Sequence, residues 1–135
     1  MSSLQQQKLS WVHDAEHVDW QALSALYARA GMGNKAPELL QTAFSNSRYV
    51  VFLYQDEELV GAGRVVADGC YCAIICDVAI CPNRQNQGLG KTVMQHFLTQ
   101  LNGHKRVILF SRPGKEAFYT KLGFSQADNF MVIYQ

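Results

Sequence analysis

The stretch Gln85-Asn86-Gln87-Gly88-Leu89-Gly90 lies between an apolar run, Ala73–Cys81 with Pro82, and an amphipathic segment, Leu89–Leu101. A strand, a glycine-bearing turn and a helix in this order leave the first helical N–H groups without backbone partners. Because the helix dipole is positive at that end, such a turn is a favourable anion site. The stretch therefore predicts a ligand that carries phosphate.

Hydrophobic periodicity on either side of this turn predicts an α+β fold. Strands are expected at Leu9–His13, Tyr49–Tyr54, Leu59–Ala67, Cys70–Cys81, Arg106–Ser111 and Phe130–Tyr134, and helices at Trp20–Ala30, Pro37–Asn46, Leu89–Leu101 and Pro113–Leu122. This order, β-α-α-β-β-β-α-β-α-β, predicts an antiparallel meander followed by a right-handed crossover that makes the fourth and fifth strands parallel. We expect one mixed sheet with helices on both faces.

Length and composition fit a single domain over residues 1–135, in which residues 1–8 form a frayed terminus. Hydrophobic residues make up 48% of the chain, charged residues 17%, and the formal net charge is +1. This balance provides no field for nucleic acid or anionic lipid, and no apolar run approaches the roughly 20 residues of a membrane-spanning helix. We therefore expect a cytoplasmic enzyme or binding protein without nucleic-acid or membrane partners.

The four cysteines fall in the pattern C-x-C-x3-C-x4-C at Cys70, Cys72, Cys76 and Cys81. A metal site is the alternative to consider, but the pattern lacks a paired C-x-x-C and the histidines lie elsewhere. Cysteine also serves as a small buried hydrophobe in strands. We expect that packing role and predict no metal.

Two nucleotide-binding motifs can be compared with the glycine turn, and neither fits. A Walker A loop needs a glycine five residues before Gly90, where the chain has Gln85. A dinucleotide fingerprint needs a third glycine at the position of Val93 and an acidic residue about twenty positions further on. A plain glycine turn without a ligand is the remaining alternative.

The longer stretch Asp77–Gly90 resembles the acetyl-coenzyme A signature of the GCN5-related N-acetyltransferase (GNAT) family. The family pattern is Gln/Arg-x-x-Gly-x-Gly/Ala at the start of the third helix, after a strand that ends in an apolar residue and proline. A second block, Ala117–Phe124, is similar to the family sequence Phe-Tyr-x-x-x-Gly-Phe. The expected element order is also that of the family, so the resemblance covers about residues 9–134.

The resemblance implies acetyl-coenzyme A as cosubstrate. Backbone amides from Gln85 to Gly90 would bind its pyrophosphate, and the backbone of Val78 and Ile80 would pair with the pantetheine arm like an added strand. That pairing requires the fourth and fifth strands to splay apart. The full set of implied cofactor-binding residues is Val78, Ala79, Ile80, Gln85, Asn86, Gln87, Gly88, Leu89, Gly90 and Lys91, with Arg84 as a further source of charge.

The implied reaction transfers acetyl directly from the thioester to a primary amine. The amine must lose a proton before it attacks, and the departing thiolate benefits from gaining one. Tyr119 is the candidate acid by its matched position, with a core tyrosine as the alternative, and Phe118 is expected to fill the core beside it. Asp77 is a candidate base or else an anchor for a neighbouring loop. An acetyl-cysteine route through Cys76 or Cys81 has no activating group in the sequence.

Ser111–Tyr119, Val60–Arg64 and Asp68-Gly69 resemble a subgroup of small bacterial and plastid acetyltransferases, some of which act on arylalkylamines such as serotonin. The subgroup commonly has Val-His where this chain has Ile80-Cys81. A small-molecule amine, arylalkylamine or polyamine, is the expected acceptor. A peptide amine acetylase and a catalytically silent coenzyme A sensor are the alternatives, and a homodimer is an open alternative to a monomer. The acceptor pocket is expected from the first two helices, the loop between them at Gly31–Pro37, and the last strands. Aromatic side chains nearby either line this pocket or belong to the core, and they are Trp11, Trp20, Tyr27 and Phe44.

Overall fold

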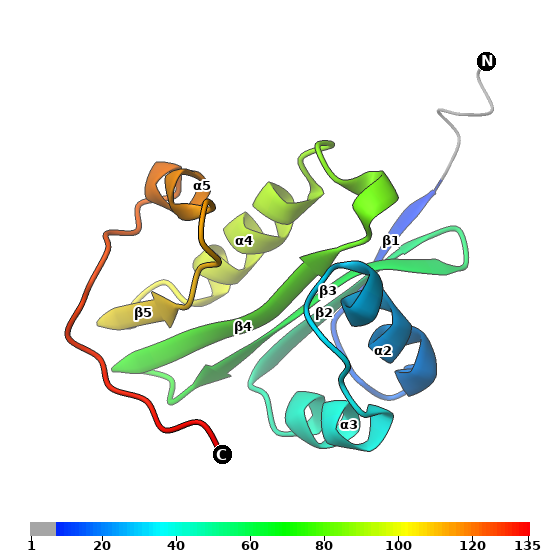
Figure 1. Ribbon diagram of the computed structural model, residues 1–135, viewed down its shortest axis with the longest axis horizontal. Helices are drawn as coiled ribbons and strands as arrows, with labels where there is room; N and C mark the ends of the chain where they lie inside the picture. Colours follow the sequence, from blue (N-terminus) through cyan, green and yellow to red (C-terminus); the bar gives the residue numbers. More distant parts are fainter. Residues whose placement is uncertain (1–7) are drawn as a thin grey trace.

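The computed structural model describes residues 8–135 and contains one mixed sheet flanked by helices (Figure 1). In chain order the elements are β1 (Leu9–Val12), α2 (Trp20–Arg29), α3 (Pro37–Ser45), β2 (Tyr49–Gln55), β3 (Glu58–Ala67), β4 (Cys72–Ile80), the 3₁₀ helix η1 (Pro82–Arg84), α4 (Leu89–Gln100), β5 (Arg106–Leu109) and α5 (Glu116–Lys121). The predicted α+β class and the order of the elements through α5 are confirmed.

The sheet has the strand order β1-β2-β3-β4-β5, so strands that follow one another in the chain are also neighbours in space. The first four strands pair antiparallel, and β4 pairs parallel with β5. The parallel register runs only from Cys72 opposite Arg106 to Ile75 opposite Leu109. Because β4 continues to Ile80, its last residues have no strand of the described chain, residues 8–135, beside them on this edge, as the predicted splay requires.

Helices cover both faces of the sheet, which the packing of two adjacent residues of β3 demonstrates. A Cβ on Gly63 would lie 3.0 Å from the ring of Phe97, which belongs to α4. The next residue, Arg64, points the other way, with its guanidinium 6.0 Å from the ring centre of Phe44 in α3. Successive side chains of a strand alternate between faces, so α4 and α3 lie on opposite sides of the sheet (Figure 1).

The core forms where apolar helix positions meet the buried central strands. Asp19 caps α2, because its carboxylate accepts hydrogen bonds from the N–H groups of Gln21 and Ala22, both at 3.1 Å. Helical spacing then buries Tyr27 completely beneath the sheet. The rings of Phe44 and Phe52 pack 5.2 Å apart in the same core. These contacts hold α2 and α3 against one face of the sheet.

A β-bulge interrupts β4 in the middle of the strand. Ala79 pairs with Ala62, but the next pair in the ladder is Cys76 with Arg64, so β4 contains one extra residue here. Asp77 occupies the bulge with a φ of 56°, in the left-handed region that few residues other than glycine adopt. The bulge lies close to the point in the sheet where β5 ends, because Ile75, which pairs with the last residue of β5, is two residues before Asp77.

The predicted last strand, Phe130–Tyr134, is wrong. Residues 125–135 form no ladder, and Met131 is 97% exposed, although the ring of Phe130 packs 5.2 Å from that of Phe110. Apolar and aromatic residues favour a strand only where a neighbouring strand accepts their backbone hydrogen bonds, and none does so here. The frayed terminus predicted for residues 1–8 lies, apart from residue 8, outside the described part of the chain.

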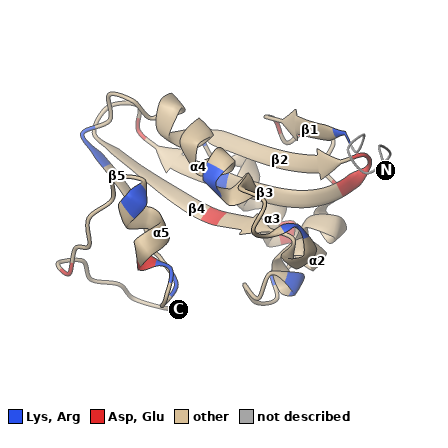
Figure 2. Cartoon of the chain, turned by 90° about the horizontal axis from the view of Figure 1, so that it is seen from above, with Lys and Arg blue, Asp and Glu red and all other residues tan. Residues whose placement is uncertain are grey.

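Charged residues are spread thinly over the helices, strands and loops. In the view of Figure 2, blue and red residues alternate without one large area of a single sign. This agrees with a net charge of +1. Between residues 8 and 135, none of the helices has the length and apolar character needed to cross a bilayer.

Candidate functional site

The end of β4 presents unpaired backbone groups along one edge. Cys81 N–H donates to Val60 O at 2.7 Å, so these two residues form a hydrogen-bonded pair of the antiparallel ladder with β3. Hydrogen-bonded and non-hydrogen-bonded pairs alternate along such a ladder. The N–H and C=O groups of Val78 and Ile80 therefore point away from β3, toward the edge that β5 leaves open. Ile80 O accepts a hydrogen bond from the Gln85 side chain at 3.1 Å, so the Ile80 N–H and the backbone groups of Val78 are the ones that this edge offers to a ligand.

The turn after β4 leads directly into α4 and has the geometry of an anion site. Asn86 and Gly88 adopt left-handed φ values of 65° and 79°, and Gly88 is the N-cap of the helix. Thr92 N–H donates to Gly88 O at 3.0 Å, which completes the first helical turn. Helix geometry leaves the N–H groups of Leu89, Gly90 and Lys91 without a backbone acceptor. No side chain caps this end, and its first turn contains no acidic residue.

The two glycines of the turn differ in whether the fold requires a glycine at that position. Gly88 needs its positive φ, whereas a Cβ built there would meet no atom within 4 Å. At Gly90 the φ is helical, and an added Cβ would only make an ordinary 3.8 Å contact with Ile80. The fold itself does not require glycine at position 90. Space beside the backbone at this point is available to a ligand.

Two residues near the turn make contacts other than those expected from the sequence. The Arg84 side chain donates to Gln55 Oε1 and lies 3.6 Å from the carboxylate of Glu58, so it fixes the β2–β3 hairpin instead of facing the turn. Gln85 N–H donates to Pro82 O at 3.3 Å within the 3₁₀ helix, and its side chain donates to Ile80 O at 3.1 Å. In this structure the Gln85 side chain joins the strand end to the turn, and the backbone N–H of Gln85 is already hydrogen-bonded.

A cavity of about 80 Å³ lies where β4 and β5 separate. It is lined by Met32, Ile75, Asp77, Val78, Met94, Leu109, Phe110, Arg112 and Tyr119, which come from β4, α4, α5, the end of β5 and the loop after α2. The two catalytic candidates, Asp77 and Tyr119, thus share one small cavity. Met32 supports the prediction that residues 31–37 contribute to it. Val78 links the cavity to the open edge of β4.

Tyr119 is half-buried in the cavity wall, and burial raises the pKa of its hydroxyl above the ordinary value of 10.0. The positive charge of Arg112 opposes this rise without cancelling it. The hydroxyl therefore carries its proton at neutral pH, as a proton donor must. Phe118 does not fill the core as expected: it is 37% exposed, because the six-residue α5 turns this side chain outward.

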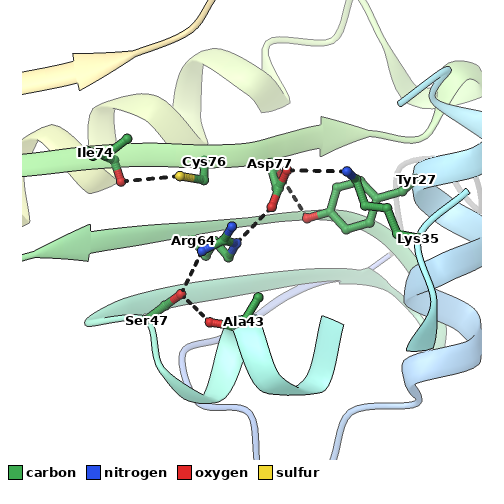
Figure 3. A network of polar contacts seen from close by, with 8 residues as sticks. All are labelled: Tyr27, Lys35, Ala43, Ser47, Arg64, Ile74, Cys76 and Asp77. Atoms are coloured by element: carbon green, nitrogen blue, oxygen red, sulfur yellow. Dashed lines mark hydrogen bonds and ion pairs between the residues drawn. The ribbon is translucent and has the colours of Figure 1, made fainter. Parts of the chain in front are cut away.

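Asp77 is the centre of a polar network on the opposite face from α4 (Figure 3). Arg64 Nε donates to Asp77 Oδ2 at 2.8 Å, and Lys35 Nζ lies 3.9 Å from Oδ1. The buried Tyr27 hydroxyl donates to Asp77 O at 2.6 Å, and burial raises the pKa of Tyr27 so that it keeps this proton. The Asp77 carboxylate thus lies beside the loop that bears Lys35, with only a long ion pair between them.

Arg112 closes the side of the cavity and was not singled out from the sequence. Its guanidinium donates to Ala30 O at 3.3 Å and to Gly31 O at 2.9 Å, which ties the loop after β5 to the end of α2. Residues 112 and 31 are far apart in the chain, so only the fold brings them together. Arg64 and Lys35 were missed for the same reason.

The cysteines and histidines form no reactive centre. Burial raises the pKa of Cys76, which disfavours its thiolate, and the buried Cys81 thiol donates to Asn83 Oδ1 at 2.9 Å. All four cysteines are free, and residues 8–135 contain no cluster of three or more potential metal ligands. His13 and His96 stack 4.7 Å apart without lining the cavity.

The aromatic residues expected near the acceptor pocket do not line the cavity. Phe44 and Trp20 pack on each other with ring centres 6.1 Å apart, and Tyr27 is fully buried. Trp11 lies beside His96. A larger and more open hollow of about 500 Å³ lies near β1, lined by residues that include Asp14, Asp56 and Tyr54. It is separate from the open edge of β4, so the smaller cavity is the candidate site.

Comparison with known proteins agrees with this geometry. Residues 12–124 match the model of the acetyltransferase (GNAT) family. The chain is 34% identical over 116 residues to serotonin N-acetyltransferase 2, chloroplastic, from Oryza sativa subsp. japonica, a match that covers 80% of this chain and 57% of the relative. It is 30% identical to the uncharacterized N-acetyltransferase ycf52 of Porphyra purpurea, over 84% of this chain and 69% of the relative.

Solved structures share the fold. A GNAT family acetyltransferase from Streptococcus pneumoniae TIGR4 superposes with a TM-score of 0.78 and 22% identity, covering 95% of this chain and 99% of that one. The chain spans little more than half the length of the rice relative. With the family match over most of its length, this chain belongs to the acetyltransferase (GNAT) family.

Proposed function

We propose that this protein transfers acetyl from acetyl-coenzyme A to the primary amine of a small molecule, with an arylalkylamine as the first candidate. The observation that supports it most strongly is the combination of an open edge on β4 with an uncapped helix start directly after it. An anionic group with an extended arm fits such an arrangement. Family membership identifies acetyl-coenzyme A as the ligand to test.

In this proposal the pyrophosphate lies against the N–H groups of Gln87 to Lys91, where helix geometry leaves donors and the dipole favours negative charge. The pantetheine arm pairs with Val78 and Ile80, whose backbone groups face the open edge. Ala79 points its own backbone groups toward β3, so it supports the platform without pairing. The arm then delivers the thioester to the cavity that contains Tyr119 and Asp77.

Tyr119 acts as the acid that protonates the departing thiolate. Its raised pKa keeps the hydroxyl protonated over the physiological range. Asp77 attracts the protonated acceptor and accepts a proton from it, directly or through water, before the nitrogen attacks the thioester carbon. Because Arg64 already donates to one carboxylate oxygen of Asp77, the other oxygen is the one available to an acceptor.

The lining of the cavity supports the acceptor class. Its apolar side chains, such as Met32, Leu109 and Phe110, favour an amine with a hydrophobic body. Similarity to the rice serotonin N-acetyltransferase supports the arylalkylamine. A homodimer stays a prediction, as does the compartment in which the protein acts.

Thiol release from acetyl-coenzyme A, followed with a panel of acceptors, tests the proposal. We expect turnover with arylalkylamines such as serotonin and weaker turnover with polyamines. Turnover with lysine peptides alone would reassign the protein to peptide acetylation. Binding of acetyl-coenzyme A without turnover on any amine would favour a sensor.

A further inference from the structure

A primary amine of the chain itself lies beside the candidate transfer cavity. Lys35 Nζ is 3.9 Å from Asp77 Oδ1, and Asp77 lines the cavity together with Tyr119. The same ammonium lies 5.8 Å from the ring centre of Tyr27 (Figure 3). A carboxylate and an aromatic face are the groups that hold an alkylammonium ion. Lys35 therefore occupies a place suited to the ammonium of an acceptor.

The position of Lys35 is set by its loop and not only by a long side chain. Ser24 Oγ–H donates to Lys35 O at 2.6 Å, which fixes the backbone at this residue. At the other end of the loop, Arg112 donates to Gly31 O at 2.9 Å. Met32 between these anchors lines the cavity. The fold therefore holds this loop against the cavity, with the amine of Lys35 directed at Asp77.

Lys35 is held less tightly than the second cation on Asp77. Arg64 Nε lies 2.8 Å from the carboxylate, whereas Lys35 Nζ is 3.9 Å away and its side chain is 32% exposed. An ion pair of this length and exposure is weak, so the lysine can leave it at little cost. Asp77 would keep its hydrogen bond from Arg64 when Lys35 moves toward the cavity.

We propose that Lys35 is an internal acceptor, so that the protein acetylates its own Lys35 when no other amine is present. This inference rests on the proposed function, because acetyl-coenzyme A supplies the acetyl group. The Lys35 ammonium gives one proton to Asp77, and the nitrogen lone pair attacks the thioester carbonyl carbon. The C–S bond breaks, and the thiolate takes a proton from Tyr119.

The second N–H proton of Lys35 passes to the tyrosyl oxygen, and Asp77 returns its proton to solvent. The products are Nε-acetyl-lysine and free coenzyme A, with one proton released overall. Acetylation removes the positive charge of Lys35. Asp77 then keeps only Arg64, and the ammonium of an external acceptor no longer competes with Lys35 for the free carboxylate oxygen.

The test incubates the full chain with acetyl-coenzyme A and no acceptor, and maps acetylated lysines by peptide mass spectrometry. We expect Lys35 to gain one acetyl group about tenfold faster than Lys105, an exposed lysine outside the cavity, because a positioned amine reacts faster than a free one. The rate should not depend on protein concentration, since the transfer occurs within one chain. Lys35→Arg removes the modification, whereas the control Lys105→Arg leaves Lys35 acetylation unchanged.

Acetylation of Lys35 that proceeds equally fast in Tyr119→Phe would be chemical modification by the thioester and would overturn the proposal. Lys35 reacting no faster than Lys105 would overturn it as well. If thiol release with serotonin is measured in parallel and persists while Lys35 stays unmodified, the internal acceptor is wrong and the proposed function stands. If calorimetry detects no binding of acetyl-coenzyme A, both are wrong.

Discussion

The two halves of β4 are both largely apolar in sequence and differ in how their backbone groups are paired. Residues 73–75 pair with β3 on one edge and with β5 on the other, whereas Ala79 and Ile80 pair with β3 alone among the described strands. The bulge at Asp77 lies at the boundary between them. The backbone groups of the first half are therefore hydrogen-bonded within the sheet, and the second half leaves donors and acceptors for a ligand. Substitutions in the two halves should separate stability from binding.

Of the substitutions considered, loss of the Tyr119 hydroxyl should have the largest effect, a decrease in activity. Tyr119→Phe is expected to lower kcat by roughly 100-fold to 1000-fold, the usual contribution of a general acid, without loss of stability. Because the active form is protonated and burial raises the pKa of Tyr119, activity of the wild type should not fall on the alkaline side until the pH exceeds 10.0. A pH–rate profile of both proteins measures this, and an unchanged kcat in the variant would remove Tyr119 from the mechanism.

A smaller side chain in the paired half should lower the free energy of unfolding more than a smaller side chain in the open half. Ile75 is 4% exposed, so Ile75→Ala is expected to reduce the free energy of unfolding by about 2–5 kcal/mol. Val78→Ala in the open half removes less buried area and should cost about 1 kcal/mol. Acetyl-coenzyme A should still bind to Val78→Ala, because only backbone groups of residue 78 are proposed to pair. Denaturant titration and calorimetry would contradict the comparison if Val78→Ala proved the less stable of the two.

Two glycines provide a matched pair for the same contrast. A Cβ at Gly63 would lie 3.0 Å from Phe97 and 3.1 Å from Val78, so Gly63→Ala should destabilise the fold by about 1–3 kcal/mol. At Gly90 the added Cβ has room, so Gly90→Ala should keep the wild-type Tm. Because the family pattern accepts alanine at this position, Gly90→Ala should also keep the Kd for acetyl-coenzyme A within about tenfold of the wild type, a change below about 1.4 kcal/mol. A Tm of Gly90→Ala as low as that of Gly63→Ala would contradict the contrast between the two positions.

The turn that precedes the paired half of β4 should lose stability in acid. This is the smallest of the expected effects. Asp68 accepts hydrogen bonds from the N–H groups of Cys70, Tyr71 and Cys72, and these lower its pKa from 3.8 to about 2. A lowered pKa contributes stability above 3.8 that is lost as the pH falls toward about 2. The Tm of the wild type should therefore decrease more steeply over this range than that of Asp68→Asn. If the Tm changed with pH in the same way in both proteins, the hydrogen bonds to Asp68 would contribute nothing to stability.

Local sequence patterns predicted most of the fold because most elements carry their own signals. Asp19 marks the start of α2, Pro37 that of α3, and Gly88 the turn before α4, and each lies where the structure has it. The last strand failed because a strand also needs a partner, which the amino-acid pattern of residues 130–134 does not encode. The bulge at Asp77 left no mark in the apolar run that contains it.

The candidate site was predictable only as far as motifs extend along the chain. The turn at Gly88 and Gly90 and the block around Tyr119 are local patterns, and the structure brings Tyr119 into one cavity with Asp77. Lys35 and Arg112 reach that cavity through contacts between loops distant in the chain, so no spacing rule identifies them. The contacts of Arg84 could not be predicted from the sequence, because its partners Gln55 and Glu58 belong to the β2–β3 hairpin, far from it in the chain.

Amide hydrogen exchange of β4, measured by NMR with and without acetyl-coenzyme A, shows whether the open edge of this strand binds the ligand. We expect the Val78 and Ile80 amides to exchange readily in the free protein and to become protected when the ligand is added. The amides of residues 73–75, already paired on both edges, should keep their rates. Protection of neither Val78 nor Ile80 at saturating acetyl-coenzyme A would contradict the assignment of this edge as the binding platform.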